Sequence, residues 1–162
     1  MRPASIGIVY LAAIAVAGLS PFALGQVVAG GGLEVPTELS TIQEAIDNVG
    51  DLHGYEIRIA KGIHYENPVI ETELSMRGSG KVVIQGNPGS STLTASCSIR
   101  LSDVHLVGGI SATTVTLTQE EGRSEFHDVR VTGGRPAAIS ASWSGAASVD
   151  PMHGLWLSGC KV

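Results

Sequence analysis

The chain has 162 residues, a formal net charge of −5 at pH 7, and only 15% charged residues. This length is enough for one domain with a buried core. Nucleic acids and anionic membranes bind basic surfaces, so the acidic balance argues against both as the main partner. It also disfavours a tight grip on polyanionic sugars, unless calcium bridges the two negative partners.

Residues 1–25 have the features of a secretory signal peptide. Arg2 supplies the basic start, residues 6–19 are apolar, and small residues precede a cleavage position before Gln26. The alternative is an uncleaved anchor that continues to Leu24. Cleavage leaves nine basic against fifteen acidic residues and no membrane segment. We therefore expect a secreted, periplasmic or cell-surface protein, with a flexible linker at residues 26–34.

Residues 41–49 are expected to form a short amphipathic helix. Thr41 and Glu44 have the spacing of a capping box, and Ser40 is an alternative cap. The helix would cover the first turn of the fold that follows and shield its edge from other strands. Its apolar stripe, at helical spacing, consists of Ile42, Ala45, Ile46 and Val49.

Beyond the helix, a short strand that ends at glycine recurs every 22 to 26 residues, as in 103–109 and 128–134. Two further strands accompany it in each repeat. Three parallel strands per turn, each alternating inward and outward side chains, make a closed coil. The sequence thus predicts an all-β fold, a right-handed parallel β-helix (solenoid) of about five coils over residues 35–162, with an N-terminal capping α-helix.

The register of the coils follows from the apolar residues expected to point inward. A twisted antiparallel sandwich is the alternative fold, but its hairpin turns would recur every 8–12 residues. In the main strand, the inward columns are Ile57, Val82, Val104, Val129 and Leu155, then Ile59, Ile84, Leu106, Val131 and Leu157. The preceding strand supplies Met76, Leu101, Phe126 and Met152, and the following strand Val69, Leu93, Val115 and Ile139.

Cys97 and Cys160 are the only cysteines, and the repeat separates them by more than two coils. Bridged Cα atoms lie within about 7 Å of each other, so two free, partly buried thiols are expected. The last strand, 155–159, has no cover of its own. A solenoid without a terminal cap tends to pair, so we expect a C-terminally incomplete chain or self-association through the open last coil.

The N-terminal part carries a pattern of residues: Val35-Pro36, then Thr41-Ile42-Gln43-Glu44-Ala45-Ile46-Asp47, then Gly62, Tyr65, Glu66 and Asn67. This pattern resembles the cap and first coils of the pectin-lyase-like superfamily of right-handed parallel β-helix proteins. The resemblance covers residues 35–90 and implies a fold shared by pectate lyases, pectin methylesterases and many secreted surface proteins. The catalytic motifs of the methylesterases are absent, and 134–136 is interpreted as a turn.

The predicted register also gathers polar side chains on the outer face. Asp103 and Asp128 would stack one coil apart, with His105 and Arg130 beside them and Trp156 below. Calcium-dependent lyases of the superfamily hold calcium between stacked carboxylates, which makes the two aspartates a candidate calcium site. The tryptophan could stack on a sugar face. The alternative is an ordinary polar face of cross-strand charge pairs.

Two classes of function stay open. The first is a non-catalytic surface or carbohydrate-binding module, which the short stack and the missing catalytic motifs favour. The second is a truncated or partner-completed carbohydrate-active enzyme, pectate lyase-like or pectin esterase-like. No catalytic residue is assigned, and calcium is the one cofactor considered. The expected partner is a polysaccharide or glycan surface.

Overall fold

The computed structural model shows a parallel β-solenoid of about four turns, one fewer than predicted. The predicted signal peptide and most of the linker lie outside the described residues, and the first strand begins at Leu33, inside the predicted linker. Nowhere in the described part of the chain is there an apolar helix of membrane-spanning length. The described residues are 33–36, 38–49, 56–109, 111–119, 122–143 and 154–162.

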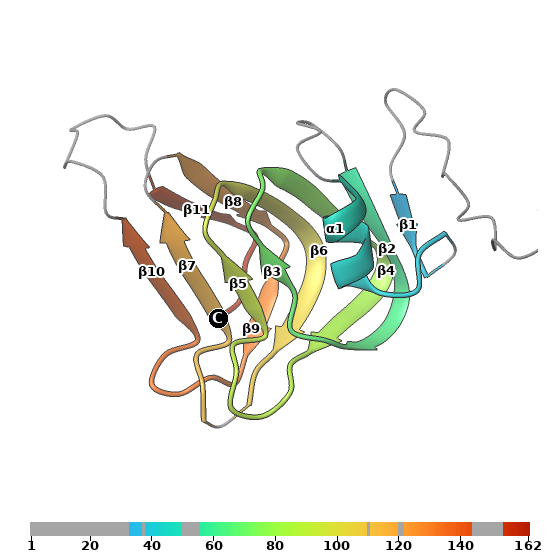
Figure 1. The fold of residues 1–162 in the computed structure, drawn as a ribbon. Coiled ribbons are helices and arrows are strands. Elements are labelled where there is room, and N and C mark those ends of the chain that lie inside the picture. Colours follow the sequence, from blue (N-terminus) through green and yellow to red (C-terminus); the bar gives the residue numbers. More distant parts are fainter. Residues whose placement is uncertain (1–32, 37, 50–55, 110, 120–121, 144–153) are drawn as a thin grey trace, which may run out of the picture.

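Two parallel sheets form the walls of the solenoid, where the sequence predicts three separate strands per coil. The predicted preceding strand and main strand of a coil lie in the same sheet, on the two sides of a bend. Figure 1 shows the strands of successive coils side by side, with β1 at one end of the stack and β10 and β11 at the other. The larger sheet contains β1 (Leu33–Val35), β2 (Glu56–Tyr65), β4 (Leu74–Gln85), β6 (Ile99–Val107), β8 (Arg123–His127), β9 (Arg130–Thr132) and β11 (Gly154–Ser158). The four-stranded sheet contains β3 (Val69–Ile70), β5 (Leu93–Ala95), β7 (Val115–Gln119) and β10 (Ile139–Trp143).

A bend divides each coil of the larger sheet into a segment before it and a segment after it. Asp103 in β6 and Asp128 between β8 and β9 have φ values of 58° and 52°, and Gly159 has a φ of 67°. The left-handed region is costly for most residues, but Asp and Gly tolerate it. The pairs Ser102↔His127 and His105↔Arg130 place the two aspartates level with each other. Successive bends therefore stack, and each turns the chain at the same point.

The predicted inward columns are correct in the middle of the solenoid. After the bend, Val82 pairs with Val104 and Ile84 with Leu106, which in turn pairs with Val131. All five of these side chains are buried. They form the aliphatic stack that the sequence indicates.

The predicted columns are wrong at both ends of the solenoid. Ile57 pairs with Met76, before the bend, rather than lying level with Val82. In β2 the alternating apolar residues lie before the bend. The positions after the bend, opposite Val82 and Ile84, are occupied by Gly62 and His64. The sequence pattern alone does not mark which side of the bend a strand belongs to.

The last coil shows the same error. Leu155 lies opposite Ser124, and Leu157 lies opposite Phe126, so both belong before the bend. The residue predicted to pair with Phe126, Met152, lies outside the described residues. With an exposed fraction of 46%, Leu157 is an inward position without a cover among the described residues.

In the four-stranded sheet, the predicted column holds except at its first member. Leu93, Val115 and Ile139 are level, as predicted. Val69, however, pairs with Thr94 and is 43% exposed, while the next residue, Ile70, is fully buried. A one-residue shift in a strand turns every side chain to the opposite face.

The predicted helix is α1 (Ile42–Val49), and its four predicted apolar residues are all buried. Thr41 Oγ1 accepts a hydrogen bond from the Glu44 N–H at 3.0 Å, as in a capping box. The Glu44 carboxylate accepts the return bonds from Ser40, from its N–H at 2.9 Å and its hydroxyl at 2.6 Å. These bonds lower the pKa of Glu44, and the bond from the Ser40 hydroxyl has the largest effect.

Both cysteines are free and half-buried, as predicted. The Cys97 thiol lies 3.7 Å from the Ile70 carbonyl oxygen, and burial, with smaller effects of Glu73 and Glu71, raises its pKa to about 11. Cys160 contacts the Phe126 carbonyl oxygen at 3.3 Å. A thiol with so high a pKa stays protonated at neutral pH and packs as a small apolar group.

Candidate binding surface

The outer face of the larger sheet, before the bend, carries two in-register columns of polar and aromatic side chains. In β8 the buried Ser124 and Phe126 alternate with Arg123, Glu125 and His127, which therefore point outward. The first column is Glu56, Ser75, Arg100, Glu125 and Trp156, and the second is Arg58, Arg77, Ser102, His127 and Ser158. We call these residues, together with Arg123 and Asp103, the charged strip.

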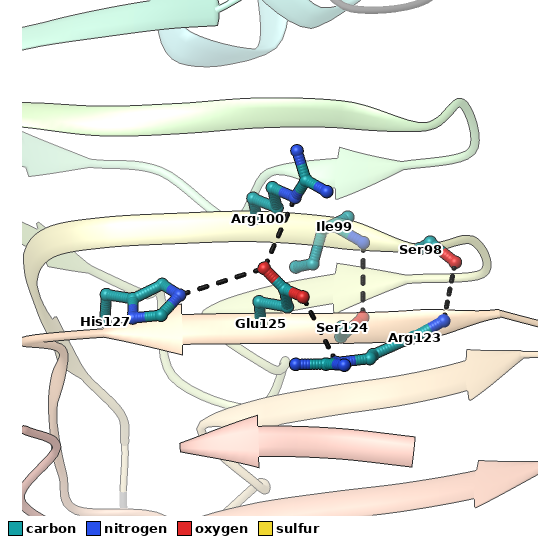
Figure 2. Close-up of polar contacts among 7 residues, drawn as sticks. All are labelled: Ser98, Ile99, Arg100, Arg123, Ser124, Glu125 and His127. Atoms are coloured by element: carbon teal, nitrogen blue, oxygen red, sulfur yellow. Dashed lines mark hydrogen bonds and ion pairs between the residues drawn. The ribbon is translucent and has the colours of Figure 1, made fainter. Parts of the chain in front are cut away.

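Glu125 is the centre of a cluster of two arginines and a histidine, as Figure 2 shows. Its carboxylate lies 3.4 Å from Arg100 Nε, 3.1 Å from Arg123 Nε and 3.8 Å from His127 Nε2. Arg123 Nε makes no hydrogen bond to Glu125 despite the short distance, so the two side chains form an ion pair only. Two arginines and a histidine thus surround one carboxylate, which keeps 22% of its side chain exposed.

Buried hydrogen bonds hold the backbone beneath this cluster. Ser98 Oγ accepts from the Arg123 N–H at 3.1 Å, and Ser124 Oγ accepts from the Ile99 N–H at 3.2 Å (Figure 2). The fully buried Gln119 donates through Nε2 to Ser124 Oγ at 2.5 Å. These bonds join the backbones of neighbouring coils directly beneath the outward charges.

Trp156 stands at one end of the charged strip, opposite Glu125. Its side chain is 57% exposed, and the Arg123 guanidinium carbon lies 4.2 Å from its ring centroid. The predicted position of this residue, below Arg130, is wrong, because Arg130 bridges to Lys161 instead. The difference follows from the misplaced last coil.

A hollow of about 500 Å³ lies at the other end of the strip. It contains two exposed ion pairs, one between Arg58 Nε and Glu56 Oε1 at 2.9 Å, and one between Arg77 Nε and Asp103 Oδ2 at 3.4 Å. A guanidinium carries five N–H donors, so one such pair leaves others for a ligand. Its lining residues are Glu56, Arg58, Arg77, Gly78, Ser79, Gly80 and Asp103.

The remaining predicted site residues lie at and after the bend. His105 is level with Arg130, as predicted, and His105 Nε2 lies 2.9 Å from Thr132 Oγ1. Desolvation, and then the nearby charges of Arg130 and Lys81, lower the pKa of His105. The structure therefore brings this pair together, but on a different segment from Trp156.

The two aspartates of the predicted calcium site are level, but each also serves its bend. Asp103 is paired with Arg77, and Asp128 packs against Gly159. Calcium takes six to eight oxygen ligands in proteins. Among the residues the structure describes, no group of three or more His, Cys, Asp or Glu side chains could hold a metal ion.

Comparison with known proteins assigns no family. No protein-family model matches the chain, and no curated protein matches it.

Sequence reasoning missed most of the charged strip. Arg77 and Arg100 were not among the predicted site residues, nor was the triplet of Arg123, Glu125 and His127. One signal was present, because these three residues alternate with the small Ser124 and the apolar Phe126. The other charges become neighbours only through the register between coils.

Proposed function

We propose that this chain is a secreted member of the pectin-lyase-like superfamily that binds a glycan, without catalysis, along the charged strip. The parallel solenoid and the residues of its N-terminal cap support the family. The missing methylesterase motifs support a non-catalytic role.

The observation that carries the proposal is the in-register strip, with the exposed Trp156 at one end and the arginine-lined hollow at the other. Five strands about 4.8 Å apart give a strip of roughly 19 Å, which suits an oligosaccharide lying across the strands. Sugar hydroxyls both donate and accept, and the strip offers both kinds of partner. The indole ring supplies an apolar surface for the C–H face of a sugar.

The charges of the strip are available because the fold gains little from them. Exposed ion pairs contribute about 0–1 kcal/mol each, and Arg58, Arg77 and Arg100 are 58%, 61% and 72% exposed in their side chains. Four of the seven arginines of an acidic chain gather here, against three carboxylates. The strip thus differs in charge from the chain as a whole.

The test is binding of the purified protein to an array of plant, algal and microbial glycans. Trp156→Ala and Arg77→Ala should each weaken binding to a retained glycan at least tenfold. The matched control is Gln85→Ala, an exposed position on the larger sheet outside the strip. Retention of no glycan by the wild type, or equal binding by all three variants, would overturn the proposal.

The carbohydrate-active enzyme is tested separately. The purified protein is incubated with pectate and calcium and with methylated pectin, and unsaturated uronides and methanol are measured. We expect neither product. Release of either product, abolished by Asp103→Ala or Asp128→Ala, would replace the non-catalytic proposal by the enzymatic one.

A further inference from the structure

The outer face of the four-stranded sheet is an ordered array of hydroxyl groups. Thr94 in β5 pairs with Thr116 in β7, which pairs with Ser140 in β10. A second column lies two residues further along each strand, where Thr118 pairs with Ser142. We call this array the hydroxyl face, and its members are Thr94, Ser96, Thr116, Thr118, Ser140 and Ser142.

Ser96 belongs to the second column although β5 ends at Ala95. The Thr94 N–H donates to the Pro68 carbonyl at 3.1 Å, and the Ser96 N–H donates to the Ile70 carbonyl at 2.9 Å. The parallel hydrogen-bond ladder therefore continues through Ser96. Because Ala95 pairs with Leu117, this serine is level with Thr118.

The array rests on a rigid base. Leu93, Ala95, Val115 and Leu117, which alternate with the hydroxyl residues of β5 and β7, are all buried. The Ser91 and Thr116 hydroxyl oxygens lie 2.8 Å apart, which restricts the rotamer of the threonine. The sheet therefore fixes the backbone positions of the array before any ligand arrives.

The chemistry of this face favours neutral ligands. None of its six residues is charged, whereas the charged strip on the other sheet carries seven arginine, aspartate and glutamate side chains. Each position carries a hydroxyl, which can both donate and accept, and the threonines add a methyl group. Two of the six hydroxyls already have a partner, because Ser142 Oγ donates to the Leu117 carbonyl at 3.5 Å and Thr116 Oγ1 lies against Ser91 Oγ. A neutral surface with regular hydroxyls complements a neutral surface of regularly spaced oxygen atoms.

The spacing of the array is close to that of water oxygens in ice. Tetrahedral O–H···O bonds of about 2.75 Å put second-neighbour oxygens about 4.5 Å apart and repeat along the stacking axis every 7.3 Å or so, about 8/3 of a bond length. Neighbouring strands are about 4.8 Å apart, and residues i and i+2 of a strand about 6.6 Å apart. The mismatches are about 0.3 Å between neighbouring strands and about 0.7 Å along a strand.

We propose that the hydroxyl face binds ice. Its rows of threonine and serine hydroxyls join the hydrogen-bond network at the crystal surface, and the threonine methyl groups order the water between the rows. This face is independent of the glycan-binding strip, so either proposal can fail while the other stands.

The test is partition of the purified protein into slowly growing ice, together with the shape of single crystals in its presence. The wild type should concentrate in the ice fraction and produce faceted crystals. Thr118→Tyr places a large ring over the second column and should lower incorporation at least fivefold. Gln85→Tyr places the same ring on the larger sheet and should leave incorporation unchanged.

A second variant protects the test against misfolding. Thr118→Val keeps the branched shape, loses only the hydroxyl, and should lower incorporation by a smaller factor while the urea midpoint stays at the wild-type value. Exclusion of the wild type from ice overturns the proposal, as does equal incorporation of Thr118→Tyr and Gln85→Tyr. Adsorption to crystalline cellulose that Thr118→Tyr abolishes, without any incorporation into ice, would assign the face to a polysaccharide instead.

Discussion

The side-chain amide of Gln43 pairs with the backbone of Val69 in the way a neighbouring strand would. The Val69 N–H donates to Gln43 Oε1 at 2.8 Å, and Gln43 Nε2 donates to the Val69 carbonyl at 3.2 Å. Val69 opens β3, the first strand of the four-stranded sheet. An unpaired strand edge is a template for aggregation. Gln43 of α1 occupies the hydrogen-bonding groups of Val69 at the exposed edge of β3.

Gln43→Ala should therefore destabilise the protein by about 1–2 kcal/mol, because two hydrogen bonds at the sheet edge are lost together. Urea unfolding measures the change in the free energy of unfolding. Gln85→Ala removes an exposed glutamine from the larger sheet and should change it by less than about 0.5 kcal/mol. Equal effects of the two substitutions would show that the edge contact contributes nothing.

Glu66 ties the start of α1 to the first coil. Its carboxylate accepts hydrogen bonds from the Ile42 N–H at 2.9 Å and the Gln43 N–H at 3.2 Å. An acceptor and a negative charge at a helix N-terminus each stabilise the helix. Glu66→Ala should cost about 1–2 kcal/mol and Glu66→Gln less, since it keeps an acceptor.

Thermal unfolding at low and high salt separates these two contributions. Salt should narrow the gap between the wild type and Glu66→Gln, because screening weakens only the charge effect. If the difference in thermal midpoint between the wild type and Glu66→Gln does not change with salt, the charge of Glu66 does not contribute to the helix cap.

Three of the residues that resemble the pectin-lyase-like cap have a structural task here, which is why they predict the fold. Beside Gln43 and Glu66, Asn67 joins the first two coils, donating to the Ser91 carbonyl at 2.7 Å and accepting from the Asn87 N–H at 2.9 Å. The same residues say nothing about a ligand, since none of them lies in the charged strip. The sequence therefore predicts the cap and the solenoid much better than the site.

The register at both ends could not be predicted because it depends on the bends. Apolar and polar residues alternate in the same way before and after a bend. The sequence pattern therefore does not show that Ile57 lies before the bend and Val82 after it. Asp103 and Asp128 adopt left-handed conformations at the bends. An aspartate is only a weak sign of such a bend in the sequence, because it is also common on the polar faces of strands. The residues of the charged strip become neighbours only in that register, so the strip could not be predicted from the sequence.

The aspartates at the bends are expected to matter for their backbone conformation. Asp128→Val should destabilise the protein by about 1–2 kcal/mol, since β-branched residues tolerate the left-handed region poorly. Asp128→Gly should be close to neutral. Urea unfolding of both variants tests this expectation, and equal destabilisation would show that the carboxylate is the important group.

The same aspartates allow a direct test of calcium. If their task is the bend, then calcium and a chelator should give the same thermal midpoint for the wild type. Asp103→Asn keeps a side chain that tolerates the left-handed region and removes the charge. A midpoint that calcium raises in the wild type but not in this variant would support the predicted calcium site.

His105 should make the stability of the fold depend on pH. Its pKa is lowered in the folded protein, by desolvation first and then by Arg130 and Lys81, from an ordinary value of 6.5. Above 6.5 the ring is neutral in both states, and the contribution to stability is fully present. As the pH falls below 6.5, the unfolded chain takes up the proton first, so this contribution is progressively lost until the pH passes the folded-state pKa. Urea midpoints between pH 7.5 and pH 5 should fall more steeply for the wild type than for His105→Gln, and parallel curves would contradict the assignment.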